Sequence, residues 1–188
     1  MTKAGETGMM TTTDYEYAVR VSNLFSQILT KSLSERLVAE LTHEEITLPQ
    51  LQAMRYIWLH RNATVGEVAE GLDISYPSAT NMLNRLVRKG LVTRHGNPAD
   101  RRFVEVQLTE KGERITRQVE EERAARLKQV LDQMPAEQRE ALIEGLRAFV
   151  VTAVEMDKQM VEEICLRCGV KANGKCPITE LYPTVGCR

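Results

Sequence analysis

Residues 75–94 read SYPSATNMLNRLVRKGLVTR, and this segment has the clearest structural pattern in the chain. Ser75 can cap a helix, Pro77 suits its first turn, and Gly90 can end it in a left-handed conformation. One face of the predicted helix is apolar and consists of Ala79, Met82, Leu83 and Leu86. The opposite face is small, polar and basic, and consists of Ser78, Asn81, Asn84, Arg85 and Arg88. A helix of this kind packs on a core through one face and shows the other to solvent.

A second short helix precedes it. Residues 64–72, TVGEVAEGL, carry apolar residues at spacings of three and four, which predicts one buried face. Two short helices joined by a tight turn, the second with a polar outer face, are typical of a helix-turn-helix. Upstream, Thr47 and Pro49 start another helix whose predicted buried stripe is Leu51, Met54, Ile57 and Trp58.

A hairpin and long helices complete the pattern. Residues 91–94 and 103–108 alternate as strands do, and the HGNPAD between them supplies the residues of a turn. A long charged helix is predicted from Thr109 to the break at Met134-Pro135, and a last helix from Ala136 to about Ile164. The first helix is predicted from Asp14 to about Leu41.

This order of elements resembles the MarR (multiple antibiotic resistance regulator) family over residues 14–164. Its most specific parts are the step from Leu86 to Val92, Asp100-Arg101-Arg102 in the wing, and Leu108-Thr109-x-x-Gly112 after it. The resemblance implies a fold that is mainly α with a small β-wing, a winged helix-turn-helix with long N- and C-terminal dimerisation helices. It also implies a homodimer that places two recognition helices about 34 to 36 Å apart on a pseudo-palindromic operator in double-stranded DNA.

The resemblance, with the small polar residues before it and the cysteine-rich segment after it, divides the chain into five parts. These are a disordered N-terminus (1–13), an N-terminal dimerisation helix (14–46), the winged helix-turn-helix (47–112), C-terminal dimerisation helices (113–164) and a four-cysteine tail (165–188).

The polar face of residues 75–89 suits DNA on physical grounds as well. Short side chains at the start of a helix let its backbone approach the major groove, so Ser78 and Asn81 can reach base edges, together with Tyr76 and Pro77. Basic side chains further along, which would neutralise phosphates, are Arg85, Arg88 and Lys89.

In the wing, Arg101 or Arg102 can enter a narrow minor groove, and Asp100 is placed to hold an arginine in position. The predicted DNA-binding residues are Ser75, Tyr76, Pro77, Ser78, Asn81, Asn84, Arg85, Arg88, Lys89, Arg94, Asp100, Arg101 and Arg102.

Composition narrows the class of protein. The 188 residues are 43% hydrophobic and 5% aromatic with a net charge of -1, yet six of the basic residues gather between Arg85 and Arg102. This predicts a local contact with a polyanion. No apolar run is long enough to span a membrane, so we expect a cytoplasmic protein. No catalytic motif stands out and the three histidines are scattered, so we expect no enzyme.

The last 24 residues hold all four cysteines, Cys165, Cys168, Cys176 and Cys187. Two, seven and ten residues separate them, and four thiolates in one loop can close around one metal centre. Three interpretations stay open: an iron-sulfur cluster, which is favoured as [4Fe-4S]; a structural zinc; and a thiol switch. Unequal spacing and Cys176-Pro177 favour the cluster, and residues 176–187 are similar to the tails of iron-sulfur winged-helix repressors of cluster assembly.

We therefore predict a homodimeric DNA-binding regulator, a repressor, whose tail senses redox state or iron. One alternative is a regulator with a zinc-stabilised tail that responds to an organic ligand, for which Trp58 and its neighbours would form the pocket, although core packing is the first interpretation of Trp58. Another is a metal-stabilised redox or interaction protein in which the helix-turn-helix is only scaffold.

Overall fold

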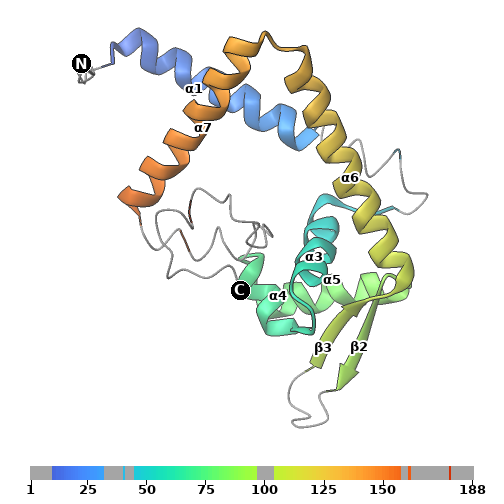
Figure 1. The fold of residues 1–188 in the computed structure, drawn as a ribbon. Helices are drawn as coiled ribbons and strands as arrows, with labels where there is room; N and C mark the ends of the chain where they lie inside the picture. Colours follow the sequence, from blue (N-terminus) through green and yellow to red (C-terminus); the bar gives the residue numbers. More distant parts are fainter. Residues whose placement is uncertain are drawn as a thin grey trace.

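The computed structural model of the chain describes residues 10–31, 40, 45–96, 104–157, 161 and 178. These residues form helices and a small antiparallel sheet (Figure 1). The elements are α1 Thr12–Thr30, α3 Leu48–Leu59, β1 Ala63–Thr64, α4 Val65–Gly71, α5 Tyr76–Arg88, β2 Val92–Gly96, β3 Val104–Leu108, α6 Glu110–Gln133 and α7 Ala136–Met156. A mainly helical fold with a small β-wing confirms the predicted fold class.

Polar side chains cap the starts of α3, α4, α5 and α6. Thr47 begins α3 and Thr64 begins α4, each with a reciprocal capping box formed with the residue three positions later. Ser75 caps α5 by accepting the Ser78 amide, and Thr109 caps α6 by accepting the Gly112 amide. Each cap satisfies an amide that a helix leaves free, so these starts are fixed locally by the sequence.

The sheet contains one strand that the sequence pattern did not predict. Its strand order is β1-β3-β2, and all neighbours are antiparallel. The predicted hairpin is confirmed as β2 and β3, in which Val92 pairs with Leu108 and Gly96 with Val104. The two-residue β1 pairs Ala63 with Val106, and it is too short to show an alternating pattern.

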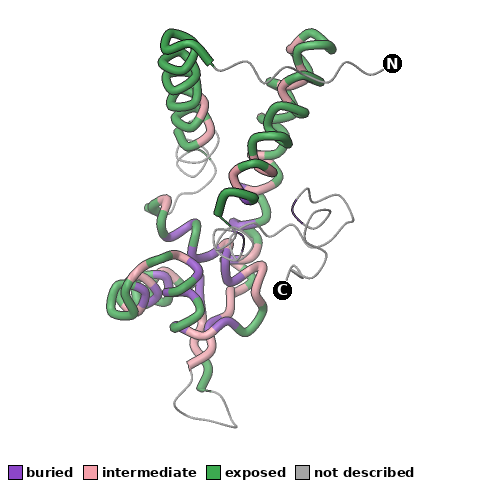
Figure 2. The backbone as a smooth tube through the Cα atoms, turned by 90° about the vertical axis from the view of Figure 1, so that its left-hand side faces the viewer, coloured by how far each residue is buried: buried purple, intermediate pink, exposed green. Residues whose placement is uncertain are grey.

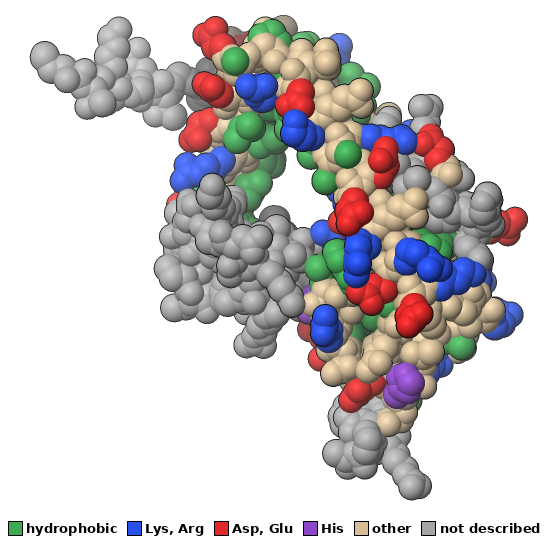
Figure 3. All heavy atoms as spheres, turned by 45° about the vertical axis from the view of Figure 1, so that its right-hand side comes forward, with side chains coloured by type: hydrophobic (Ala, Val, Ile, Leu, Met, Phe, Trp, Pro, Cys, Tyr) green, Lys and Arg blue, Asp and Glu red, His purple; other side chains and the backbone are tan. Residues whose placement is uncertain are grey.

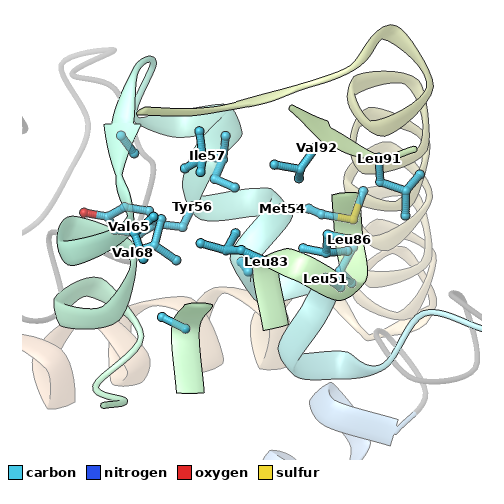
Figure 4. Close-up of a cluster of buried hydrophobic side chains, with 14 of the residues drawn as sticks. Leu51, Met54, Tyr56, Ile57, Val65, Val68, Leu83, Leu86, Leu91 and Val92 are labelled. Atoms are coloured by element: carbon cyan, nitrogen blue, oxygen red, sulfur yellow. The ribbon is translucent and has the colours of Figure 1, made fainter. Parts of the chain in front are cut away.

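One hydrophobic core holds α3, α4, α5, the sheet and the start of α6 together. Figure 4 shows side chains from several of these elements meeting in it. Its fully buried large side chains include Met54, Val68, Leu83, Leu86, Leu91, Val106 and Val119. Each such side chain stabilises the fold by about 1.5–3 kcal/mol relative to an exposed one.

The segment that follows α5 contacts the start of α6 through backbone groups. The Thr109 amide donates to the Leu91 carbonyl at 3.0 Å, and the Thr109 hydroxyl donates to the Gly90 carbonyl at 2.8 Å. Gly112 is buried one turn later, and a Cβ there would overlap the Leu91 carbonyl oxygen. Gly90 itself has a φ of +67°, which supplies the predicted left-handed end of α5.

The long helices carry little of the core. In Figure 1, α6 runs from the hairpin to the opposite end of the molecule, where α7 folds back. Figure 2 shows buried residues concentrated in the lower part of the molecule, where α3, α4, α5 and the sheet lie, and exposed residues along α1, α7 and the upper part of α6. Among its described residues, α1 buries none and α7 buries only Val154.

Two predicted helix ends were wrong. The first helix begins at Thr12 rather than Asp14, because Thr11 caps it by accepting the Asp14 amide. The last helix, predicted to continue to about Ile164, ends at Met156 because the backbone of Asp157 is extended. An aspartate is poorly placed at the carboxyl end of a helix, where the dipole favours cations. None of the described helices is long and apolar enough to cross a membrane.

Candidate nucleic-acid interface

The recognition helix α5 divides as its sequence predicts. Ala79, Leu83 and Leu86 are fully buried against the core. The predicted DNA-contacting residues that are exposed are Ser75, Tyr76, Pro77, Ser78, Asn81, Asn84, Arg85 and Arg88. They surround the outer side and the amino end of one rigid helix, whose position the core fixes.

The amino end of α5 combines small polar groups with one exposed aromatic ring. The Ser75 and Ser78 hydroxyls are hydrogen-bonded to each other at 2.8 Å, and Tyr76 beside them is 57% exposed. Asn81 is exposed one turn further along. Hydroxyl and amide groups at this spacing match the donors and acceptors of base edges in a major groove.

Two cations at the carboxyl end of α5 are available to a polyanion. Arg85 and Arg88 lie in its last turn, where the helix dipole favours positive charge. Within the described part of the chain, neither guanidinium has an acidic partner at salt-bridge distance. They therefore keep their full charge for an external ligand such as a phosphate.

The other two described cations of the basic patch bind within the fold. The ammonium of Lys89 donates to the carbonyl of Glu45, just before α3. The guanidinium of Arg94, on β2, donates through a terminal nitrogen to the Thr80 carbonyl of α5 at 3.2 Å. Both side chains are half-buried, unlike Arg85 and Arg88. Sequence reasoning missed Thr80, because its part is played by a backbone oxygen that any residue would supply.

The predicted residues of the wing tip, Asp100, Arg101 and Arg102, lie outside the described residues. The strands that lead to them are described. His95 is exposed near the end of β2, and its Nε2 is hydrogen-bonded to the Thr93 hydroxyl at 2.9 Å. In Figure 1, β2 and β3 extend below the helices of the core.

The four predicted metal ligands, Cys165, Cys168, Cys176 and Cys187, also lie outside the described residues. In the part of the chain that the structure does describe, no group of three or more His, Cys, Asp or Glu side chains could hold a metal ion.

Trp58 was predicted to belong to the buried stripe of α3, and that prediction was wrong, because the side chain is only half-buried. It lines a pocket of about 330 Å³ between the end of α3, β3 and the start of α6. The lining residues are Ile57, Trp58, Arg61, Asn62, Gln107, Leu108 and Glu113. The Gln107 amide donates to the Asn62 side-chain oxygen at 2.7 Å, which fixes both amides at the pocket wall.

Comparison with known proteins settles the family. The profile of the MarR family matches residues 46–104, which contain the helix-turn-helix and most of the wing. The uncharacterized HTH-type transcriptional regulator YfiV of Bacillus subtilis strain 168 is 33% identical over 109 residues, 58% of this chain and 68% of the relative. The chain belongs to the MarR family.

Solved structures agree with this assignment. A MarR family protein from Bacillus stearothermophilus is 27% identical and has a TM-score of 0.60, with 78% of this chain and 99% of that chain covered. Streptococcus pneumoniae FabT, solved in complex with DNA, shares the fold at 23% identity and a TM-score of 0.64, over 77% of this chain and all of FabT. This MarR-family chain is a DNA-binding transcriptional regulator, as its sequence predicted.

Proposed function

We propose that the protein is a homodimeric transcriptional repressor of the cytoplasm that reads a pseudo-palindromic operator with α5 and responds to a signal through its four-cysteine tail. The observation that carries the DNA-binding part is the outer face of α5, on which small polar groups precede two arginines that have no acidic partner among the described residues. Ser78 and Asn81 contact base edges, with Tyr76 and Pro77 beside them. Arg85 and Arg88 contact phosphates and supply affinity without sequence preference.

Salt dependence tests this proposal on a duplex that the wild-type protein selects from a random library. The logarithm of the binding constant falls with the logarithm of salt concentration by about 0.9 per phosphate contact. A dimer with Arg85→Ala and Arg88→Ala loses four contacts, so the slope becomes shallower by about 3.6. Lys128→Ala, which removes an exposed cation from α6, is the matched control and leaves the slope unchanged. A double variant with the wild-type slope would show that α5 does not face the phosphates.

The exposed apolar side chains of α1 and α7 support the dimer. Leu24 and Ile28 on α1 are 59% and 56% exposed, and Phe149 on α7 is 71% exposed. Figure 3 shows such hydrophobic side chains among the charged ones on the upper helices. Several large apolar side chains left exposed on the same helices are typical of a protein interface. A second copy is the occupant that a pseudo-palindromic operator requires, because its two half-sites mirror the twofold axis of the protein.

The regulatory part of the proposal rests on the sequence of the tail. Cys165, Cys168, Cys176 and Cys187 supply four thiolates, which suit a [4Fe-4S] cluster, with zinc as the alternative metal. A bound cluster would supply sensitivity to redox state or iron, and its loss would change the affinity for the operator. If the tail holds zinc instead, the pocket beside Trp58 is the place where an organic effector would bind, since an indole and fixed amides line it.

Metal content separates the two forms of the proposal. Protein purified without oxygen and without chelators is expected to hold about four irons and matching sulfide per chain, with a broad absorption band. About one zinc per chain in a colourless sample would replace the cluster by a structural metal. Replacing all four cysteines by serine is expected to abolish any response of operator binding to oxidant. A wild-type protein that binds the operator identically with and without oxidant would overturn the sensing role.

A further inference from the structure

Strand β2 turns one cation toward the recognition helix. Side chains alternate along a strand, so Val92 and Arg94 lie on one face and Thr93 and His95 on the other. The burial of Val92 and the hydrogen bond between His95 and Thr93 agree with this alternation. Arg94 therefore lies on the face that packs against α5, where its terminal nitrogen donates to the Thr80 carbonyl at 3.2 Å.

The Thr80 carbonyl oxygen can hold α5 in place, because it can accept a second hydrogen bond. A carbonyl oxygen within an α-helix already accepts the amide four residues later, and its second lone pair accepts one further donor. Thr80 lies in the amino-terminal half of α5, between Ser78 and Asn81, which we propose to contact base edges. A charged donor held at this oxygen resists both rotation and sliding of the helix, because either movement would break the hydrogen bond.

The surroundings of Arg94 favour a contact with α5 over a contact with DNA. Its Nε is buried and has no hydrogen-bond partner within the described part of the chain, and the Thr80 hydroxyl beside it is in the same state. An arginine that kept its guanidinium for phosphate would leave all its nitrogens in solvent, as an exposed side chain does. Turning Arg94 outward would break the hydrogen bond to the Thr80 carbonyl.

Lys89 makes a second attachment at the other end of the same helix. It follows the last turn of α5, and its ammonium donates to the Glu45 carbonyl just before α3. The two cations thus hold α5 from the wing side and from the α3 side.

From these contacts we infer that Arg94 and Lys89 are positioning residues that orient the recognition helix, and that the phosphate contacts of the described basic patch belong to Arg85 and Arg88. The inference rests on the proposed use of α5 in DNA reading and replaces the predicted DNA contacts of Lys89 and Arg94 by contacts within the fold. Sequence preference therefore depends on Arg94, whereas the number of counterions released on binding does not.

The test compares Arg94→Met with Arg85→Met on two duplexes, the selected operator and a scrambled duplex of the same length. Methionine keeps the apolar stem of arginine and removes every donor. For Arg94→Met, the ratio of the two dissociation constants is expected to fall about tenfold, the loss that one good base contact produces, with an unchanged salt slope. For Arg85→Met the ratio stays and the slope becomes shallower by about 1.8 in the dimer.

A conservative variant separates positioning from general loss of structure. Arg94→Lys keeps one charged donor for the Thr80 carbonyl and is expected to recover most of the preference for the operator. Partial unfolding would instead weaken binding to both duplexes by the same factor and leave their ratio unchanged. If Arg94→Met unfolds, Arg94→Lys alone carries the test, with an intermediate ratio and a wild-type slope expected.

Two results would overturn the inference. One is a salt slope that falls for Arg94→Met as it does for Arg85→Met, which would mean that Arg94 contacts a phosphate. The other is an Arg94→Met protein whose ratio and slope both match the wild type. Failure of the underlying DNA-reading proposal has a different signature, because the wild type would then not distinguish the selected from the scrambled duplex.

Discussion

A single methyl group at position 112 is expected to loosen the joint between the recognition helix and α6. Gly112 is buried in the first turn of α6, and a Cβ there would overlap the Leu91 carbonyl oxygen. That oxygen belongs to backbone and accepts the Thr109 amide at 3.0 Å. Since no side-chain rotation can relieve the overlap, Gly112→Ala must push the start of α6 away from Leu91, which joins α5 to β2.

Opposing effects decide the size of the change. Overpacking a tight site costs about 1–3 kcal/mol, and weakening one backbone hydrogen bond costs about 0.5–1.5 kcal/mol more. Alanine inside a helix is better than glycine by about 1 kcal/mol, which offsets part of this loss. The free energy of unfolding should therefore fall by about 2 kcal/mol.

Urea unfolding followed by circular dichroism, at one fixed protein concentration, measures this difference. Gly66→Ala is the matched control, because Gly66 is an exposed residue of α4 whose added Cβ would meet only the Thr64 hydroxyl, at 3.8 Å. The control should be at least as stable as the wild type. If Gly112→Ala unfolds at the same urea concentration as the control, the contact with Leu91 is not tight and the reasoning is wrong.

Three further predictions concern other parts of the fold. Burial, with two nearby carboxylates of α4, raises the pKa of Tyr56 above its ordinary value of 10.0. The folded state then holds this proton more tightly than the unfolded state, so stability should fall as pH rises above about 10, and less steeply in Tyr56→Phe. Phe149→Asp should convert a dimer into a monomer in size-exclusion chromatography with light scattering; an unchanged mass would remove α7 from the interface. A double-mutant cycle on Arg55 and Glu120, 3.0 Å apart between α3 and α6, should give a coupling of about 1 kcal/mol, and zero coupling would show that solvent screens the pair.

The sequence predicted elements whose signals are local. Thr47, Thr64, Ser75 and Thr109 each stand at a helix start, where the side chain accepts from the amide three positions later. The buried face of α5 follows from helical spacing alone. The strand β1 could not be predicted, because two residues show no period and their pairing depends on Val106, which is distant in the sequence.

The different roles of the four cations could not be predicted for the same reason. Arg85, Arg88, Lys89 and Arg94 look alike in a sequence, and each is compatible with a phosphate contact. What separates them is the backbone oxygen that accepts from Lys89 or Arg94, 44 and 14 residues away in the chain. Every residue has a backbone carbonyl, so the sequence does not show which carbonyls accept from a cation. Only the folded structure shows that Lys89 and Arg94 already donate within the fold.

The joints around α5 also determine where the regulator can bend. The side chains of Lys89 and Arg94 attach α5 to the Glu45 carbonyl and to β2, and Gly112 packs against the Leu91 carbonyl, so we expect α5 and the first turns of α6 to move together. The last buried residue of α6 is Val119; beyond it, Arg126 is held by ion pairs to Glu40 at 2.6 Å and to Glu122 at 3.0 Å. Ion pairs near the surface contribute little and rearrange easily, whereas a packed core does not. We therefore expect bending of α6 beyond Val119 to cost less free energy than a change of angle between α5 and the first turns of α6, which are packed on the core.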